Sequence, residues 1–210
     1  DTNVIYGVTT DHNNNSFLVG RFSGSMDFDP TTGAQLETPT GARDLYLIKL
    51  NAVGDFVFGQ RIGGSGTNQI YPYDITTDHF GDVYLVGKHS GSSLDFNGVL
   101  LSGSFNSFIY KMTNSGISQW VLGYTAEPKC VDVDLDKNLY LQGNYTSSWA
   151  DVDPTNGILN LPNNGNGEVY TIKLNQCVPT NSTINIDECD SYTSPNGSVL
   201  TVSGQYIDTI

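Results

Sequence analysis

The segments DLYLIKL (44–50), NSFIYKM (106–112) and EVYTIKL (168–174) are three copies of one strand-like pattern. Their lysines, Lys49, Lys111 and Lys173, are 62 residues apart each time. Aromatic and aliphatic residues fill most other positions, as expected for strands of a sheet. Because self-similarity at a fixed period identifies a repeat architecture, the chain is expected to consist of equivalent units.

A second motif repeats upstream of each lysine segment. VTTDHNNNSFLVG (8–20) matches ITTDHFGDVYLVG (75–87), and VDLDKNLYLQG (133–143) is a third copy, expected to be two residues shorter at its turn. Each unit is predicted to have four strands, which in the middle copy lie at about 73–77, 83–88, 108–112 and 119–122. Four antiparallel strands per repeat, in series, are typical of the blades of a β-propeller.

The composition agrees with an all-β fold. The 210 residues include 23 glycines and 12 tyrosines, only 15% are charged, and no segment shows the apolar period of an amphipathic helix. A formal net charge of −13 disfavours nucleic acid and anionic lipid as partners. The sequence also contains no apolar run long enough for a membrane helix, so direct membrane insertion is not expected, and the segment from Asp1 lacks the basic and apolar regions typical of a signal peptide.

The repeat resembles the bacterial SBBP-type (seven-bladed β-propeller) repeats over about residues 4–175. The motifs that carry the resemblance are VYLVG (83–87), FIYK (108–111) with the turn NSG (114–116), and IGGSG (62–66) before the next unit. The second copy has GYTA (123–126) in place of the last motif, and the third is expected to lack its final strand. The resemblance implies a propeller on exported or surface proteins, with no enzymatic activity common to the family.

Two regions are therefore predicted. Residues 1–176 form about three blades of an incomplete ring, at about 1–66, 67–126 and 127–176. A polar linker follows, and residues 177–210, with a PNG turn at 195–197, resemble the start of a small β-module found in surface and type IX-secreted proteins. We expect a fragment of a longer protein; the alternative is that the missing blades come from another copy of the chain.

Three cysteines, Cys130, Cys177 and Cys189, lack the spacing of a zinc site. They are expected to form one disulfide and leave one odd thiol, and the sequence does not select among the three pairings. In the module that the C-terminal segment resembles, the cysteine at the position of Cys189 pairs with a residue later in the module.

Two related motifs are candidate calcium sites. DFDPTTG (27–33) and DVDPTNG (151–157) share the pattern Asp-x-Asp-Pro-x-x-Gly, in which carboxylates at i and i+2 of a strand face the same side. The candidate metal ligands are Asp27, Asp29, Asp151 and Asp153. The alternative is that the carboxylates accept hydrogen bonds from turn N–H groups while Phe28 and Val152 pack inward. Calcium is the one cofactor candidate.

No catalytic residues are predicted. DVDLDKN (132–138) opens like an EF-hand loop but has Lys137 where glycine is required and Gly143 where a bidentate glutamate is required. His12 and His79 occupy the same turn in successive repeats, which indicates a role in the turn. Among the aromatic residues, Trp120, Tyr124 and Tyr145 are expected to fill the wedge between blades, and Trp149 is the candidate for ligand binding to a sugar ring.

The sequence therefore favours a non-enzymatic structural or adhesive segment of a large secreted or cell-surface protein, located outside the cell. Its expected partners are other domains of the same polypeptide or other surface proteins. A carbohydrate-binding or carbohydrate-processing propeller is the first alternative, with glycans as partners. A calcium-stiffened spacer is the second.

Overall fold

The computed structural model describes residues 3–91, 93–103, 105–145, 149–154, 159–162, 167–175, 192–193 and 199–200. The chain divides into two compact units, Asp1–Asn175 and Gln176–Ile210. All regular structure in the described residues is β-strand. These residues contain no helix that could cross a membrane.

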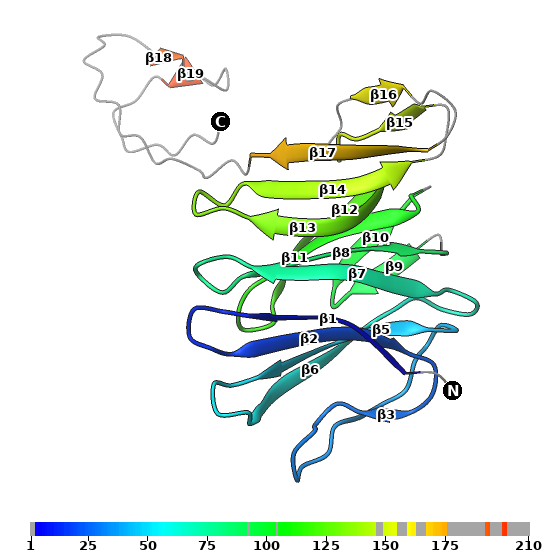
Figure 1. The fold of residues 1–210 in the computed structure, drawn as a ribbon, viewed down its shortest axis with the longest axis vertical. Helices are drawn as coiled ribbons and strands as arrows, with labels where there is room; N and C mark the ends of the chain where they lie inside the picture. The colour runs from blue at the N-terminus through cyan, green and yellow to red at the C-terminus, as the bar shows by residue number, and fades with distance from the viewer. Residues whose placement is uncertain are drawn as a thin grey trace. The chain divides into compact units, whose positions relative to one another are not determined.

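The first unit contains successive antiparallel sheets, which we call blades 1 to 3 (Figure 1). In blade 1 the strand order is β1 (Val4–Thr10), β2 (Ser16–Phe22), β5 (Asp44–Leu50) and β6 (Phe56–Ile62). In blade 2 it is β7 (Ile70–Thr77), β8 (Val83–His89), β11 (Ser107–Met112) and β12 (Ser118–Tyr124). In blade 3 it is β13 (Glu127–Val133), β14 (Leu139–Tyr145) and β17 (Glu168–Leu174). The all-β fold of propeller-like blades is confirmed, and the described sheets do not close a ring.

The four predicted strands of the middle repeat are all present, each extended by up to three residues at an end. The prediction missed a small hairpin between the second and third strand of each blade. These hairpins are β3 (Met26–Asp27) with β4 (Leu36–Glu37), β9 (Ser93–Phe96) with β10 (Val99–Ser102), and β15 (Trp149–Asp151) with β16 (Asn160–Pro162). The expected loss of the last strand of blade 3 concerns residues that lie outside the described part of the chain.

Much of the predicted C-terminal module also lies outside the description. In the second unit, β18 (Tyr192–Thr193) pairs with β19 (Val199–Leu200). The linker, Cys177, Cys189 and the PNG turn at 195–197 fall among the residues that the structure does not describe.

The turn between the first two strands is the same in all three blades. The N–H of Asp11, Asp78 or Asp134 donates to the carbonyl four residues later, at 3.0, 3.0 and 3.1 Å. The fourth residue of each turn has a positive φ: 61° at Asn14, 82° at Gly81 and 65° at Lys137. The prediction that the third copy is shorter here was wrong, because the structural repeat starts at Val131 and has the same length.

A glycine lies beneath an aromatic side chain in every blade. Gly20 pairs with Tyr46, Gly87 with Phe108 and Gly143 with Tyr170 across the second and third strands. A β-carbon at Gly87 would lie 2.7 Å from the Phe108 ring and 2.4 Å from the carbonyl oxygen of Tyr71. The first strand has an irregular register opposite each glycine, so the backbone approaches the position where a side chain would be.

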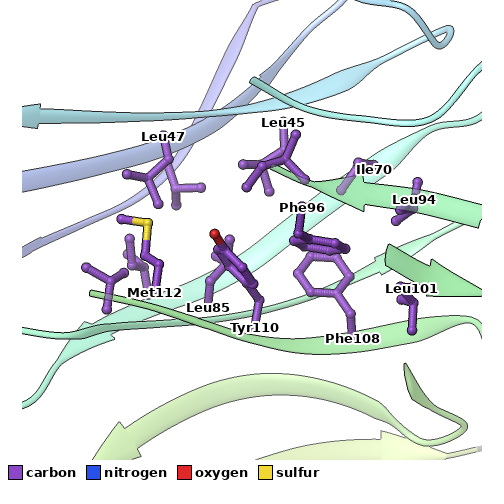
Figure 2. Close-up of a cluster of buried hydrophobic side chains, with 14 of the residues drawn as sticks. Leu45, Leu47, Ile70, Leu85, Leu94, Phe96, Leu101, Phe108, Tyr110 and Met112 are labelled. Carbon is purple, nitrogen blue, oxygen red and sulfur yellow. The ribbon is translucent and has the colours of Figure 1, made fainter. Parts of the chain in front are cut away.

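Apolar side chains fill the space between neighbouring blades. Blades 1 and 2 enclose a cluster that includes Leu45, Leu47, Leu85, Phe108 and Tyr110, with Phe96 from the hairpin of blade 2 (Figure 2). Blades 2 and 3 enclose another, which includes Tyr84, Tyr124, Leu141, Tyr145 and Tyr170. The prediction that Tyr124 and Tyr145 fill this wedge is confirmed, and Trp120 is partly buried against the same cluster.

Candidate functional site

The predicted calcium ligands lie in the small hairpins, where they hold the backbone. Asp27 Oδ1 accepts hydrogen bonds from the N–H groups of Asp29 at 3.0 Å and Gln35 at 2.8 Å. Asp151 Oδ1 accepts from Asp153 at 3.0 Å and Leu159 at 2.9 Å, which are the equivalent positions. The first carboxylate of each motif therefore fastens the two arms of its hairpin together.

The remaining groups of these motifs also serve the hairpin. Asp29 Oδ1 accepts from the N–H and the hydroxyl of Thr31 at 2.8 and 2.6 Å. Phe28 and Val152 are buried at 0% and 1% exposure. In the part of the chain that the structure describes, no three His, Cys, Asp or Glu side chains come together in a way that could hold a metal ion. The geometry thus accounts for these residues as turn-forming groups, and calcium binding stays a prediction.

Two shallow pockets lie beside the small hairpins of blades 2 and 3, at successive blade junctions. One, with a volume of about 310 Å³, is lined by residues that include Arg61, Gly63, Asp95 and Asn97. The other, of about 300 Å³, is lined by Phe105, Gly123, Thr125, Asp151 and Asp153 among others. Because the two pockets occupy equivalent positions in the repeat, they follow from the stacking of blades. Trp149, the predicted ligand-binding residue, has its backbone in β15 opposite Pro162, and its side chain lies outside the description.

The three repeated lysines take part in one structural arrangement. Each lysine pairs across the sheet with an aromatic residue of the second strand: Lys49 with Phe17, Lys111 with Tyr84 and Lys173 with Tyr140. The ammonium nitrogen lies 5.0, 5.1 and 5.2 Å from the respective ring centroid, within the range of a cation–π contact.

The turn aspartates complete this arrangement. Tyr84 and Tyr140 donate to Asp78 and Asp134 at 3.2 and 3.1 Å, and Lys173 lies 3.4 Å from Asp134. The Asn138 side chain is the main group that holds the pKa of Asp134 below its ordinary value. In blades 2 and 3 the aspartate thus connects its turn to the aromatic side chain of its own blade.

Blade 1 has phenylalanine where the other blades have tyrosine, and Asn114 of blade 2 supplies the missing donor. The Asn114 side-chain amide donates to Asp11 Oδ2 at 2.8 Å. Lys49 Nζ donates to the Asn114 carbonyl oxygen at 2.8 Å and also to its side-chain oxygen. Burial lowers the pKa of Lys49, and the negative charge of Asp11 opposes that shift. This contact joins the turns of two blades.

A second polar cluster, not predicted from the sequence, lies on the innermost strands. Among the first strands of the three blades, β7 contacts both β1 and β13 (Figure 1). Tyr73 donates to Glu127, which also pairs with Lys129 at 2.7 Å and Lys88 at 3.1 Å. Lys129 lies 3.8 Å from the centroid of the Tyr73 ring. We call Tyr73, Lys88, Glu127 and Lys129 the inner-strand cluster.

Electrostatics in the inner-strand cluster favour the ionised carboxylate. Burial alone would raise the pKa of Glu127, but hydrogen bonds from Lys129, Tyr73 and Lys88 outweigh it and lower the pKa to about 2. The pKa of Lys88 is raised by its contacts with Tyr73 and Glu127. Three of the nine basic residues, Arg21, Lys88 and Lys129, contact tyrosine rings on this surface.

The inner-strand cluster continues toward blade 1 through Arg21. The Arg21 guanidinium carbon lies 4.3 Å from the centroid of the Tyr71 ring and 5.6 Å from that of Tyr6. Its Nε and Nη1 atoms have no hydrogen-bond partner among the described residues. One signal in the sequence could have located this surface: Tyr6, Tyr73 and Lys129 all occupy the extra position where the register of the first strand shifts.

The histidines and the described cysteine form no catalytic arrangement with one another. His12 and His79 are exposed in equivalent turns, while His89 is buried and its Nδ1 accepts from the Gly91 N–H at 3.3 Å. Cys130 is exposed and unpaired within the described residues.

Comparison with known proteins assigns no family to this chain. A scan against protein-family models found no match. A search of the curated proteins also found no match. The geometry of the chain therefore carries the functional argument.

Proposed function

We propose that this chain is a non-enzymatic structural or adhesive segment of a large secreted or cell-surface protein. One observation carries the proposal: the polar side chains that repeat from blade to blade are hydrogen-bonded or paired within the fold. Lys49, Lys111 and Lys173 pack on aromatic rings of their own sheets, and the turn aspartates hold the turns. The use of these repeated side chains within the fold is expected for a module whose role is to build a scaffold.

The test is to locate the parent protein. An antibody raised against this chain would be applied to intact cells of the source, followed by surface proteolysis and cell fractionation. The proposal expects labelling of intact cells, or antigen in the medium, and loss of the surface signal after proteolysis. Antigen confined to the cytoplasmic fraction would overturn the assignment to the exterior.

We further propose that the blades belong to the SBBP type and that residues 177–210 open a module of surface or type IX-secreted proteins. The repeated four-stranded sheets support the first part, and the cysteine-containing CDSY segment (189–192) supports the second. Sequencing the parent gene tests both. Further copies of the lysine strand upstream and another cysteine downstream are expected, and a parent with neither would contradict the proposal.

A second candidate function is carbohydrate binding, which the inner-strand cluster favours. Tyrosine rings with neighbouring cations offer both stacking surfaces and hydrogen-bond donors for an acidic sugar. A glycan array that includes uronic acids would be probed with the full chain and with Tyr73→Ala. Saturable binding that the substitution removes would support this candidate, with Tyr140→Ala as a control outside the cluster. Absence of saturable binding would exclude it for the chain tested.

The third candidate is a calcium-stiffened spacer, favoured by the recurrence of Asp27 with Asp29 and of Asp151 with Asp153. Thermal unfolding would be followed with millimolar Ca²⁺ and with a chelator. A bound ion raises the midpoint by mass action, and Asp27→Asn should reduce that increase. Identical midpoints in the two conditions would reject the candidate.

A further inference from the structure

Every blade has two faces, and the repeat assigns equivalent residues to each. The leading face meets the preceding blade and carries Ile75, Leu85 and Tyr110 in blade 2. The trailing face meets the following blade and carries Tyr84, Val86 and Ile109 in blade 2. Both described junctions join an apolar trailing face to an apolar leading face.

The leading face of blade 1 is apolar but uncovered. Val8 is 65% exposed, whereas its equivalents Ile75 and Val131 are 5% and 4% exposed. Ile5 is 69% exposed, although Pro72 and Pro128 are buried at the same position. Leu18 is only partly buried, while Leu85 and Leu141 are 0% exposed. Phe28 of the blade 1 hairpin covers Phe22 and Tyr46 on this face. The uncovered part of the leading face is therefore the strip on β1 and β2 that carries Ile5, Val8 and Leu18.

The trailing face of blade 3 is polar at two positions where the other trailing faces are apolar. Gln142 occupies the position of Val19 and Val86, which are fully buried. Thr171 occupies the position of Leu47 and Ile109, also fully buried. Gln142, Thr171 and Lys173 are all exposed. A polar outer face is the feature that terminal repeats of an array require for solubility.

We infer that the leading face of blade 1 is a docking surface for one further four-stranded blade of the same kind, and that blade 3 ends the stack on its other side. The occupant must present apolar residues at the positions of Phe17, Val19 and Leu47. A second copy of this chain has only one uncovered trailing face, that of its own blade 3, and this face has the polar Gln142 and Thr171 at two of those three positions. The partner is therefore a blade with an apolar trailing face, supplied by a different stretch of polypeptide.

The test adds such a blade to the full chain. A copy of residues 3–69 is placed directly before Asn3, so that Gln69 leads into Asn3 as it normally leads into Ile70 and the linker keeps its length. Hydroxyl-radical footprinting then measures the reactivity of Ile5 and Val8 in the original blade 1, which now follows the added blade. We expect both to fall to the reactivity of Pro72 and Ile75, with Thr171 and Val169 unchanged. Unaltered reactivity of Ile5 and Val8 would overturn the inference.

Matched substitutions keep the test decisive. Val8→Asp in the original blade 1 of the extended chain should abolish the protection of Ile5, whereas Thr171→Asp on the polar face should not change it. Should the extended chain fail to fold, the unmodified chain decides: binding of an apolar fluorescent dye should fall in the Ile5→Asp, Val8→Asp double variant and persist in Val169→Asp. Equal dye binding in both would contradict the inference. A discrete dimer that Val8→Asp dissociates would show a second copy to be the occupant, and would also overturn it.

Discussion

At the positions of Gly20, Gly87 and Gly143, two neighbouring groups leave no room for a β-carbon and so require glycine. Each glycine has an aromatic ring from the third strand on one side and a carbonyl oxygen of the first strand on the other. A ring could move, but a backbone oxygen within a paired strand cannot move without breaking ladder hydrogen bonds. The repeated glycine in the sequence therefore reports a close backbone approach.

Gly87→Ala is expected to lower the free energy of unfolding by about 1–3 kcal/mol, because the added β-carbon overpacks a closed site. Urea denaturation of the full chain measures the change. Gly33→Ala is the control, since a β-carbon there would meet only the movable Asp29 side chain in an exposed turn. Equal effects of the two substitutions would show that the contact with Phe108 and Tyr71 does not determine the cost.

His89 is a titratable residue in a position that blade 1 fills with Phe22. Burial lowers the pKa of His89 from 6.5. Its buried Nε2 has no hydrogen-bond partner among the described residues. The unfolded state thus binds a proton more readily than the folded state, so stability falls as the pH drops below about 6.5.

His89→Phe should therefore raise the free energy of unfolding by about 1 kcal/mol at pH 7.5, by removing an unsatisfied buried group. The gain should be larger at pH 5.5, where the histidine must be protonated on unfolding. Chemical denaturation at the two pH values measures both effects. The reverse substitution, Phe22→His, should introduce the same acid sensitivity into blade 1; a variant pair without this difference would refute the assignment.

At the scale of elements, the inner-strand cluster joins β7, β8 and β13 and thus connects two blades. The folded-state pKa of Glu127, about 2, lies below its ordinary value of 4.5. A group with a depressed pKa stabilises the fold fully above its unfolded value and loses that contribution as the pH falls toward its folded value. The cluster should therefore weaken between pH 4.5 and about 2.

Glu127→Gln is expected to cost about 1 kcal/mol at pH 6, a modest value because the partners are partly exposed. The difference from the wild-type chain should shrink as the pH falls toward 2 and vanish below it, where both side chains are neutral. Unfolding curves at pH 6 and pH 3 measure this convergence. Glu168→Gln, in blade 3 but outside the cluster, should show no comparable pH-dependent difference.

Asn114 is the element-scale link at the opposite end of the strands. Asn114→Ala removes the side-chain donor to Asp11 and one of the two Asn114 oxygen atoms that accept hydrogen bonds from Lys49. The free energy of unfolding is therefore expected to fall by about 1–3 kcal/mol. Thermal or urea unfolding detects it. Ala52 occupies the equivalent turn position in blade 1, and Ala52→Asn should leave stability unchanged. A neutral Asn114→Ala would mean that the contact does not contribute to blade stacking.

For the whole molecule, the excess of negative charge outweighs the local ion pairs. The chain has 22 acidic and nine basic residues, so most carboxylates have no cation to pair with. Salt screens both the attraction within pairs and the wider repulsion, and the repulsion involves more groups. Raising the ionic strength from about 0.01 to 0.15 M should raise the melting temperature. A decrease in scanning calorimetry would show that the ion pairs dominate.

The sequence by itself determined the repeat, the all-β class, the strands of the middle blade, and the aspartate and glycine turns. These features depend on side-chain alternation and on hydrogen bonds between residues a few positions apart, so they are visible along the chain. It left open whether the hairpin carboxylates at Asp27 and Asp151 bind a cation or the backbone, and the tertiary structure shows both holding backbone N–H groups.

Only the tertiary structure decided which face of each blade is covered and which groups meet between blades. Glu127 reaches Tyr73 and Asn114 reaches Asp11 because the stacking of sheets brings positions 54 and 103 residues apart into contact. Alternation along a strand gives two faces but does not say which neighbour each one meets. The sequence does not show that Val8 and Gln142 are exposed where their equivalents are buried. Only the stacked blades show it, because burial is a property of the packed molecule.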